Sequence, residues 1–495
     1  MSAPGRPKHE SSLGEEVAQR PEGRPFVAPG RPKHEPSLGE EVAQRPEGRS
    51  FIERGRDDAG VAGGHIAVVG AGWAGLAAAI ELQRLGHRAT VLEVRHEPGG
   101  RARQLPPSRF QAPLDNGQHL LLGAYHATLR LMRQLGCPPE TKLWRMPLTL
   151  RSADGEFQLR VPRLPSPWHA LAGLGFTRGL TGPERWAAVR LVWWLRQRNW
   201  HPEDTLTVAE LMARHRQPFA LTRKLWAPLC LAALNTPIDI ACAQMFAHVL
   251  RDSLDGAASD SDLLLPRTDL SRLWPQAAAA RLDMRYGQLV RSVQPGPNDI
   301  QVDGATYDAA ILAVPPYMAS RMIAALPGSA PLLDVLDGFS YAPIATLTLQ
   351  LASPMPALPQ PLLMLREDHD RGHVGQWVFD RTRLLGLDPA RPELTVVASQ
   401  HPALLDLSRS TLMQRLRTQL SEQLALPPVA EAELIIEKRG TFESRPGLAR
   451  PGHLTPWPRL ALAGDYTDTG YPAVLEGAVR SGIDAAAALH DALTA

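Results

Sequence analysis

The chain has 495 residues, of which 44% are hydrophobic and 21% charged, and its formal net charge is +2 at pH 7. This composition is ordinary for a globular enzyme, and the small net charge gives no reason to expect a nucleic-acid partner. The three cysteines, Cys137, Cys230 and Cys242, form no C-x-x-C pair, so we expect neither a disulfide framework nor a metal site. The length favours two domains over one simple core.

No stretch of the sequence reaches the roughly 18 uninterrupted apolar residues of a membrane-spanning helix, and the N-terminus lacks the apolar core of a secretory signal. We therefore expect a cytoplasmic protein, either free or attached to the inner face of the cytoplasmic membrane without crossing it.

The N-terminal part contains a tandem repeat. Its two copies, residues 3–26 and 28–51, are nearly identical and are rich in Pro, Gly, Arg and Glu. Such segments bury too little apolar surface to offset the entropy of ordering the chain. We predict that residues 1–64 form a disordered tail, and we assign it no function.

A strand–helix–strand unit is predicted to follow the tail. The apolar run HIAVVG (65–70) is typical of a buried strand, residues 73–85 of a helix, and ATVLEV (89–94) of a second strand. The sequence GAGWAG (70–75) joins the first strand to the helix and fits the G-x-G-x-x-G pattern. Its glycines allow a tight turn, close approach of a pyrophosphate and close helix packing, while the helix N-terminus supplies partial positive charge.

An acidic residue completes this unit. Glu93 ends the second strand, where a carboxylate can accept the hydroxyls of an adenosine ribose. The unit therefore predicts dinucleotide binding through a set of six residues: Gly70, Gly72, Trp73, Ala74, Gly75 and Glu93.

Two further motifs indicate FAD instead of NAD. Residues 98–103, PGGRAR, resemble the G-G-R signature that follows the second strand in the amine oxidase and phytoene desaturase superfamily. The C-terminal AGD (463–465) resembles the second cofactor motif of that superfamily, and the segment from residue 475 would open a helix toward the flavin. The resemblance adds these residues to the cofactor site: Gly99, Gly100, Arg101, Arg103, Gly464, Asp465, Leu475, Glu476 and Ala478.

A longer element narrows the resemblance. The sequence LDNGQHLLLGAY (114–125) is similar to that of hydroxysqualene dehydroxylases, and so are AGDYTDTGYP (463–472), LNTP (234–237) and FESRPGLARP (442–451). The likeness spans residues 65–490. It implies further cofactor contacts from Gly117, Gln118 and Val290, and non-covalent FAD because no cysteine lies in the C-terminal region.

The fold that this resemblance implies is α/β. A Rossmann-type FAD-binding domain is expected from three segments, residues 65–150, 281–316 and 440–495. A mixed α+β substrate-binding domain is expected from residues 151–280 and 317–439.

The activity that the resemblance implies is FAD-dependent reductive dehydroxylation of hydroxysqualene to squalene, in bacterial squalene and hopanoid synthesis. The synthases that make presqualene diphosphate and hydroxysqualene would be its partners. A carotenoid desaturase or a flavin amine oxidase of the same fold remains the alternative. A prenyl-protein escort protein, which shares the fold without FAD, is disfavoured by the intact cofactor motifs.

The reaction needs a general acid to protonate the departing hydroxyl. His119 is the first candidate, and a structural role for this histidine is at least as well supported. Asp115, Tyr471 and Tyr125 are the other candidates, although Asp115 also suits a local cap of its turn. Asp380 lies in a segment that could face the substrate, but we assign it to a solvated loop.

The segment 184–200 combines four tryptophans with four arginines. The tryptophans are residues 186, 193, 194 and 200. Arginine with tryptophan is the composition of a helix at the surface of an anionic membrane. An amphipathic helix packed on the substrate domain, with its arginines in solvent, explains the pattern equally well.

Overall fold

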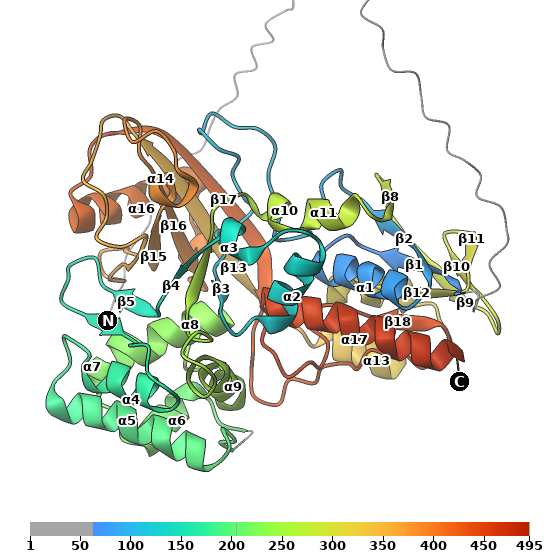
Figure 1. The fold of residues 1–495 in the computed structure, drawn as a ribbon, viewed down its shortest axis with the longest axis horizontal. Coiled ribbons are helices and arrows are strands. Elements are labelled where there is room, and N and C mark those ends of the chain that lie inside the picture. The colour runs from blue at the N-terminus through green and yellow to red at the C-terminus, as the bar shows by residue number, and fades with distance from the viewer. Residues whose placement is uncertain (1–62, 204, 495) are drawn as a thin grey trace, which may run out of the picture. The chain divides into compact units, whose positions relative to one another are not determined.

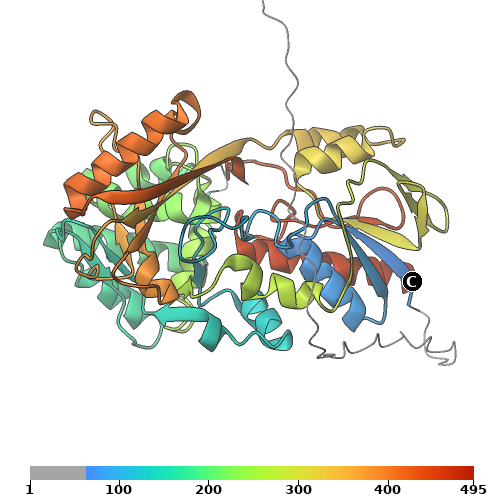
Figure 2. The same ribbon diagram turned by 90° about the horizontal axis from the view of Figure 1, so that it is seen from above.

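The computed structural model describes residues 63–203 and 205–494. The tandem repeat, and the predicted tail up to residue 62, lie outside the described residues. Figures 1 and 2 show two β-sheet regions and a group of helices. None of the described helices is long and apolar enough to cross a membrane.

The first region is a five-stranded parallel sheet with the order β18-β12-β1-β2-β8. Its strands are β1 (His65–Val69), β2 (Arg88–Glu93), β8 (Asp283–Tyr286), β12 (Ala309–Leu312) and β18 (Leu460–Leu462). The central strand β1 is apolar and buried along nearly its whole length, as expected for a parallel sheet covered on both faces. The predicted strands 65–70 and 89–94 correspond to β1 and β2.

Two helices cross closely on this sheet (Figure 1). They are α1 (Trp73–Arg84) and α17 (Leu475–Thr494). A Cβ atom at Gly482 of α17 would lie 2.1 Å from the carbonyl oxygen of Ala74 in α1, so the small residue permits the close crossing. Other elements of this region are α2 (His126–Gln134), α10 (Leu270–Leu273), α11 (Pro275–Ala279), β9 (Val293–Pro295), β10 (Ile300–Val302), β11 (Ala305–Tyr307), α12 (Pro316–Ile323) and α13 (Ala330–Asp337).

The second region is an antiparallel sheet with the order β14-β15-β16-β13-β17. Its strands are β13 (Tyr341–Leu351), β14 (Leu362–Met364), β15 (Trp377–Asp380), β16 (Glu393–Ser399) and β17 (Val429–Phe442). Helix α16 (Arg409–Leu424) packs its buried leucines on this sheet, and α14 (Arg381–Leu385) and α15 (Ala403–Asp406) flank it. The paired ends of β13 and β17 pack into the core of the first region, so these strands connect the regions (Figure 2).

A group of helices forms the third part (Figure 1). Its elements are α4 (Trp168–Gly175), α5 (Gly182–Gln197), α6 (Val208–Arg214), α7 (Phe219–Leu221), the π-helix η1 (Thr222–Trp226), α8 (Ala227–Leu234) and α9 (Ala243–Leu254). Small strands and one short helix adjoin them: β3 (Leu121–Leu122), α3 (Pro139–Lys142), β4 (Leu143–Met146), β5 (Thr149–Arg151), β6 (Gln158–Arg160) and β7 (Leu263–Pro266). We call residues 158–226 the helical end.

The strands of the first sheet all come from the three segments assigned to the FAD-binding domain. Within those segments, however, β3 and β4 pair with β7, and β17 runs across the predicted boundary at residue 440. The exact domain bounds stay a prediction.

Candidate cofactor site

The turn after β1 depends on glycine. Gly70 has φ +103°, and a Cβ atom there would lie 2.5 Å from the carbonyl oxygen of Ala313. At Gly75 a Cβ atom would lie 1.9 Å from the carbonyl oxygen of Gly70, so no larger residue fits where α1 leaves the strand. A Cβ atom at Gly72 would meet nothing closer than the Cα of Gly100, at 4.0 Å. The space beside Gly72 is therefore open to a ligand.

The N-terminus of α1 opens at the same place. Gly72 is its N-cap residue, no side chain caps the helix, and its first turn contains no acidic residue. The first N–H groups of a helix need an acceptor, and together with the helix dipole they favour an anion. The open space beside Gly72 and this uncapped helix end together fit a diphosphate group.

Glu93 lies beside the same turn. Its carboxylate is buried and accepts hydrogen bonds from the backbone N–H of Ala71 at 2.7 Å and of Arg95 at 2.9 Å. Two bonds leave acceptor capacity on the carboxylate. The position suits the predicted contact with ribose hydroxyls.

The loop after β2 packs on the loop after β1. Gly99 donates its N–H to the carbonyl oxygen of Ala71 at 2.8 Å and forms a parallel bridge with Gly72. Gly100 has φ +62°, and a Cβ atom there would lie 2.9 Å from the Cα of Gly72. Arg103 donates to the carbonyl oxygen of Gly100 at 2.7 Å. The two glycine motifs, residues 70–75 and 98–103, therefore pack against each other, and we call them the cofactor cradle.

An ion pair joins the two ends of the folded chain at this cradle. The Arg101 guanidinium lies 2.6 Å from the Asp465 carboxylate, and it also donates to the carbonyl oxygen of Gly440 at 3.0 Å. The structure therefore brings the G-G-R motif and the C-terminal motif together. The Asp465 carboxylate therefore already accepts one hydrogen bond, from Arg101.

Arg450, which we did not predict from the sequence, holds the C-terminal loop in place. Arg450 donates to the carbonyl oxygens of Asp465 at 2.7 Å and Tyr466 at 3.2 Å. The hydroxyl of Ser481 in α17 accepts from the N–H of Gly464 at 2.8 Å. Arg450 lies in the tract 442–451. The likeness of this tract to the hydroxysqualene dehydroxylases is the feature of the sequence that could have identified it.

The side chain of Glu476 ties two helices together, and a contact between this residue and the cofactor stays a prediction. Its fully buried carboxylate accepts hydrogen bonds from the N–H groups of Ala127 and Thr128, at 3.0 and 2.9 Å. It also pairs with Arg480 at 2.8 Å. The side chain therefore caps α2 and ties it to α17. Leu475 and Ala478 are half-buried and pack on the core around α1.

The element that starts at Leu114 runs beside the G-G-R loop. Asn116 donates its backbone N–H to the carbonyl oxygen of Arg103 at 2.9 Å and its amide to that of Arg101 at 3.2 Å. Asp115 accepts from the N–H of Leu270 at 2.9 Å. Burial raises the pKa of the Asp115 carboxyl to about 7, so this group keeps its proton to a much higher pH than an ordinary aspartate does.

The surroundings of His119 lower its pKa, whereas those of Asp115 raise the pKa of that carboxyl. Its Nδ1–H donates to the carbonyl oxygen of Gly117 at 2.8 Å, which leaves Nε2 as an acceptor in the neutral ring. Burial and the charge of Arg101 lower the pKa of His119. The neighbouring amide of Gln118 points back to the carbonyl oxygen of His119, at 3.4 Å.

Tyr125 and Tyr471 lie near each other beside Asp252. Burial, followed by nearby acidic groups, raises the pKa of both phenols, so both stay protonated near neutral pH. Arg480 stacks on the Tyr471 ring with its guanidinium carbon 4.5 Å from the ring centroid. Val290, another predicted contact, is buried in the core of the first region.

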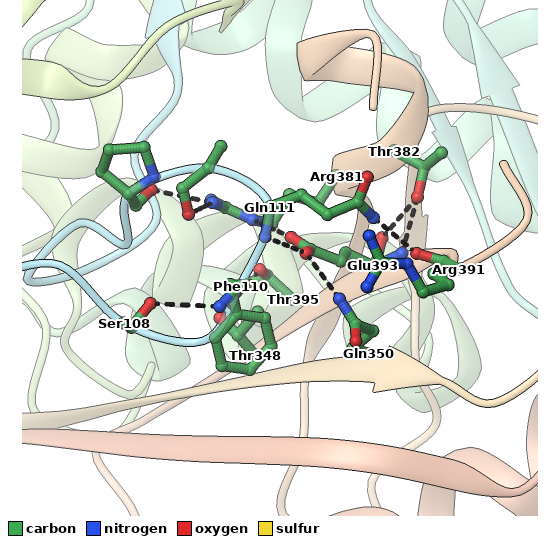
Figure 3. A network of polar contacts seen from close by, with 12 residues as sticks. Ser108, Phe110, Gln111, Thr348, Gln350, Arg381, Thr382, Arg391, Glu393 and Thr395 are labelled. Carbon is green, nitrogen blue, oxygen red and sulfur yellow. Dashed lines mark hydrogen bonds and ion pairs between the residues drawn. The ribbon is translucent and has the colours of Figure 1, made fainter. Parts of the chain in front are cut away.

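A buried ion pair fixes the chain that leads into this element (Figure 3). Arg381 lies 2.9 Å from Glu393, and both side chains are almost fully buried. Arg381 also donates to the carbonyl oxygens of Ala112 and Pro113, both at 2.7 Å, and Glu393 accepts from the N–H of Gln111 at 2.8 Å. The pair therefore positions the residues just before Asp115.

The placement of Asp380, next to this pair, corrects a prediction. We assigned it to a solvated loop, but it is buried and caps α14 by accepting from the N–H of Arg383 at 2.9 Å. Residues before a short helix are common sites for such caps, and the sequence alone did not reveal the helix.

The tryptophans of segment 184–200 divide into two kinds. Trp186 and Trp193 of α5 are 65% and 47% exposed. Trp194 is half-buried, and Trp200 is buried and donates its indole N–H to Asp255 at 3.0 Å. Only two of the four tryptophans are therefore available to a membrane surface.

The comparisons with known proteins agree with this geometry. Residues 73–490 match the family described as flavin containing amine oxidoreductase. The chain is 30% identical to the hydroxysqualene dehydroxylase of Rhodopseudomonas palustris, over 85% of this chain and 97% of the relative. It is 26% identical to the hydroxysqualene dehydroxylase of Zymomonas mobilis, over the same shares.

Solved structures share the fold at lower identity. Putrescine oxidase with bound putrescine has a TM-score of 0.62 at 18% identity, covering 86% of this chain and 98% of the oxidase. Cyclohexylamine oxidase of Brevibacterium oxydans has a TM-score of 0.61 at 16% identity, covering 88% and 100%. These likenesses show an α/β fold of the kind found in FAD-binding oxidoreductases, and the family match and the dehydroxylase relative show that FAD is the cofactor of this chain. The chain is an FAD-dependent oxidoreductase that belongs to the flavin-containing amine oxidoreductases and, among them, to the hydroxysqualene dehydroxylases.

Proposed function

We propose that this protein reduces hydroxysqualene to squalene with FAD. The observation that carries the proposal is the 30% identity to a hydroxysqualene dehydroxylase over 97% of that relative's length. The cofactor residues are consistent with it, because the glycine cradle, Glu93 and the Arg101–Asp465 pair lie together. Gly72 and the start of α1 would hold the diphosphate, Glu93 the ribose, and the C-terminal loop the flavin side.

The substrate chemistry defines what the protein must do. Hydroxysqualene is an allylic alcohol, so its C–O bond can ionise to a delocalised cation once the oxygen is protonated. Reduced FAD, when bound, supplies hydride. The chain has to hold the reacting carbon in place, donate a proton to the oxygen and exclude water that would recapture the cation.

For the proton we propose Asp115 ahead of His119. Asp115 lies on the element that pairs with the G-G-R loop, and its raised pKa leaves a proton available near pH 7. Neutral His119 has already committed its N–H to Gly117, so His119 is better suited to accept a hydrogen bond than to donate one. The two phenols, Tyr125 and Tyr471, are weaker acids than either group at this pH.

Product analysis tests the reaction. The purified protein with reduced flavin is incubated anaerobically with hydroxysqualene. The protein with oxidised flavin is incubated separately with phytoene and with a primary amine, each together with an electron acceptor (a quinone or dioxygen), and all products are identified by mass spectrometry. We expect squalene from hydroxysqualene alone. Turnover of phytoene or the amine without squalene would replace the proposal with a desaturase or an amine oxidase.

We also propose where the protein works. A C30 isoprenoid is nearly insoluble in water, so the enzyme must receive it from a bilayer or from a neighbouring enzyme. The exposed Trp186 and Trp193, with the exposed Arg190 between them on α5, support attachment to the inner face of the cytoplasmic membrane. The synthases that make hydroxysqualene are the proposed partners at that surface.

A further inference from the structure

Large exposed apolar side chains are concentrated in the helical end. Among the described residues, six of the ten lie between residues 164 and 219. Those six are Leu164, Trp168, Phe176, Trp186, Trp193 and Phe219. Scattered single residues of this kind are ordinary, whereas a concentration of aromatics marks a binding surface.

The same part of the chain is strongly basic. Residues 158–226 contain 11 of the 53 Lys and Arg residues but only four of the 51 Asp and Glu residues. The rest of the chain therefore has more acidic than basic residues. On α5, Trp186, Arg190 and Trp193 are spaced so that they lie along one exposed face of the helix. Apolar and cationic groups are thus presented together.

A cavity of about 640 Å³ is lined almost entirely by residues of this basic segment. Its lining includes Gln158, Arg160, Arg163, Phe176 and Arg178. The backbones of Gln158 and Arg178 pair as an antiparallel bridge, so their side chains and that of Arg160, two residues along β6, lie on one face. Phe176, which is 82% exposed, belongs to both the cavity and the aromatic group.

The cavity arginines differ in their ion pairing. Arg163 lies 3.5 Å from Asp262. Arg160 and Arg178 pair with no acidic side chain in the part of the chain that the structure describes, and both are exposed. A guanidinium pair without a counter-ion beside an aromatic side chain suits a phosphate group attached to an apolar body.

We propose that the helical end docks on an anionic phospholipid leaflet and that the Arg160–Arg178 cavity binds a lipid headgroup phosphate. This inference rests on the proposed attachment to the membrane and adds the site that recognises the lipid. The tryptophans of α5 enter the interface, and the arginines select anionic lipid. Charge complementarity supports this occupant, because anionic leaflets attract clustered arginines and interfacial aromatics add apolar contact.

Vesicle co-sedimentation of the full-length protein at low salt tests the inference. The probes are vesicles of phosphatidylcholine alone and vesicles that also contain phosphatidylglycerol. We expect the double variant Arg160→Gln/Arg178→Gln to lose roughly tenfold or more of its affinity for the phosphatidylglycerol vesicles. Its weak binding to phosphatidylcholine should not change. The variant Trp186→Ala/Trp193→Ala should lose binding to both.

The matched control is Arg130→Gln/Arg417→Gln, which removes two exposed arginines from α2 and α16. It should bind as the wild type does. If the Arg160/Arg178 variant also binds as the wild type does, the phosphate site is overturned while membrane attachment stands. If the wild type binds neither vesicle, both are overturned. Squalene formation from detergent-solubilised substrate tests the reaction separately.

Discussion

The cofactor cradle has no room for side chains at most of its glycines, whereas the helical end exposes large side chains to solvent. In the cradle, a Cβ atom added at Gly70, Gly75 or Gly100 would lie within 3 Å of a backbone atom. In the helical end, Trp186 and Phe176 project into solvent. At these positions the cradle requires residues without a side chain, and the glycine pattern shows that requirement directly in the sequence. The surface of the helical end depends on which large side chains are buried and which are exposed. The number of tryptophans in the sequence does not show this.

The largest expected effect comes from filling the cradle. Gly75→Val should strongly destabilise the fold, because its Cβ would lie 1.9 Å from the carbonyl oxygen of Gly70, which is a backbone atom with little freedom to move away. We expect a loss above the roughly 1–3 kcal/mol of ordinary overpacking, measured from urea unfolding midpoints.

Gly72→Val is the matched control in the same loop. Its Cβ would have only one neighbour, at 4.0 Å, so the protein should fold and yet be purified without flavin absorbance. A Gly72→Val protein with a full complement of flavin would contradict the assignment of this space to the cofactor.

The second test concerns the loop that leaves the cradle. Arg381→Met leaves the Glu393 carboxylate buried without its cation, and we expect a loss of about 3–5 kcal/mol in the free energy of unfolding. The double variant Arg381→Met/Glu393→Leu should recover part of that loss, because no buried charge remains. Equal stability of the single variant and the wild type would show that the pair does not hold the loop.

The third test compares two tryptophans from one segment. Trp200→Ala removes a buried indole and should cost about 3–5 kcal/mol in denaturant unfolding. Trp186→Ala removes an exposed one and should change stability by no more than about 0.5 kcal/mol. Similar losses for the two variants would mean that α5 does not present Trp186 to solvent.

The smallest expected effect is a change in pH dependence. The folded-state pKa of Asp115, about 7, is above the value in the unfolded chain, so its contribution to stability is complete in acid and is lost as pH rises toward and through 7. Asp115→Asn should remove that part of the pH dependence in unfolding experiments. If Asp115 donates the proton, the same variant should also lose the fall in squalene formation above pH 7, and His119→Gln should keep it.

The local parts of the site were predictable. The strand–glycine–helix unit, Glu93 and the G-G-R motif are close in sequence, and each carries its own pattern. Arg450, in a loop, and the Arg381–Glu393 pair, at the starts of α14 and β16, were missed because no sequence pattern at these positions distinguishes a buried ionic or hydrogen-bonded side chain from a solvated charge. Asp380 was assigned wrongly for a related reason, since it caps a helix whose start the sequence did not define, and the cap that the Glu476 side chain forms on α2 was missed in the same way.

The sequence by itself determined the first strand–helix–strand unit, the cofactor class and the family, because glycine patterns and apolar runs act over a few residues. Only the tertiary structure decided that Arg101 meets Asp465, that Glu476 faces α2 and that Trp200 is buried while Trp186 is not. Those outcomes depend on contacts between residues hundreds of positions apart, or on which face of a helix a neighbour covers. No local pattern encodes either of them.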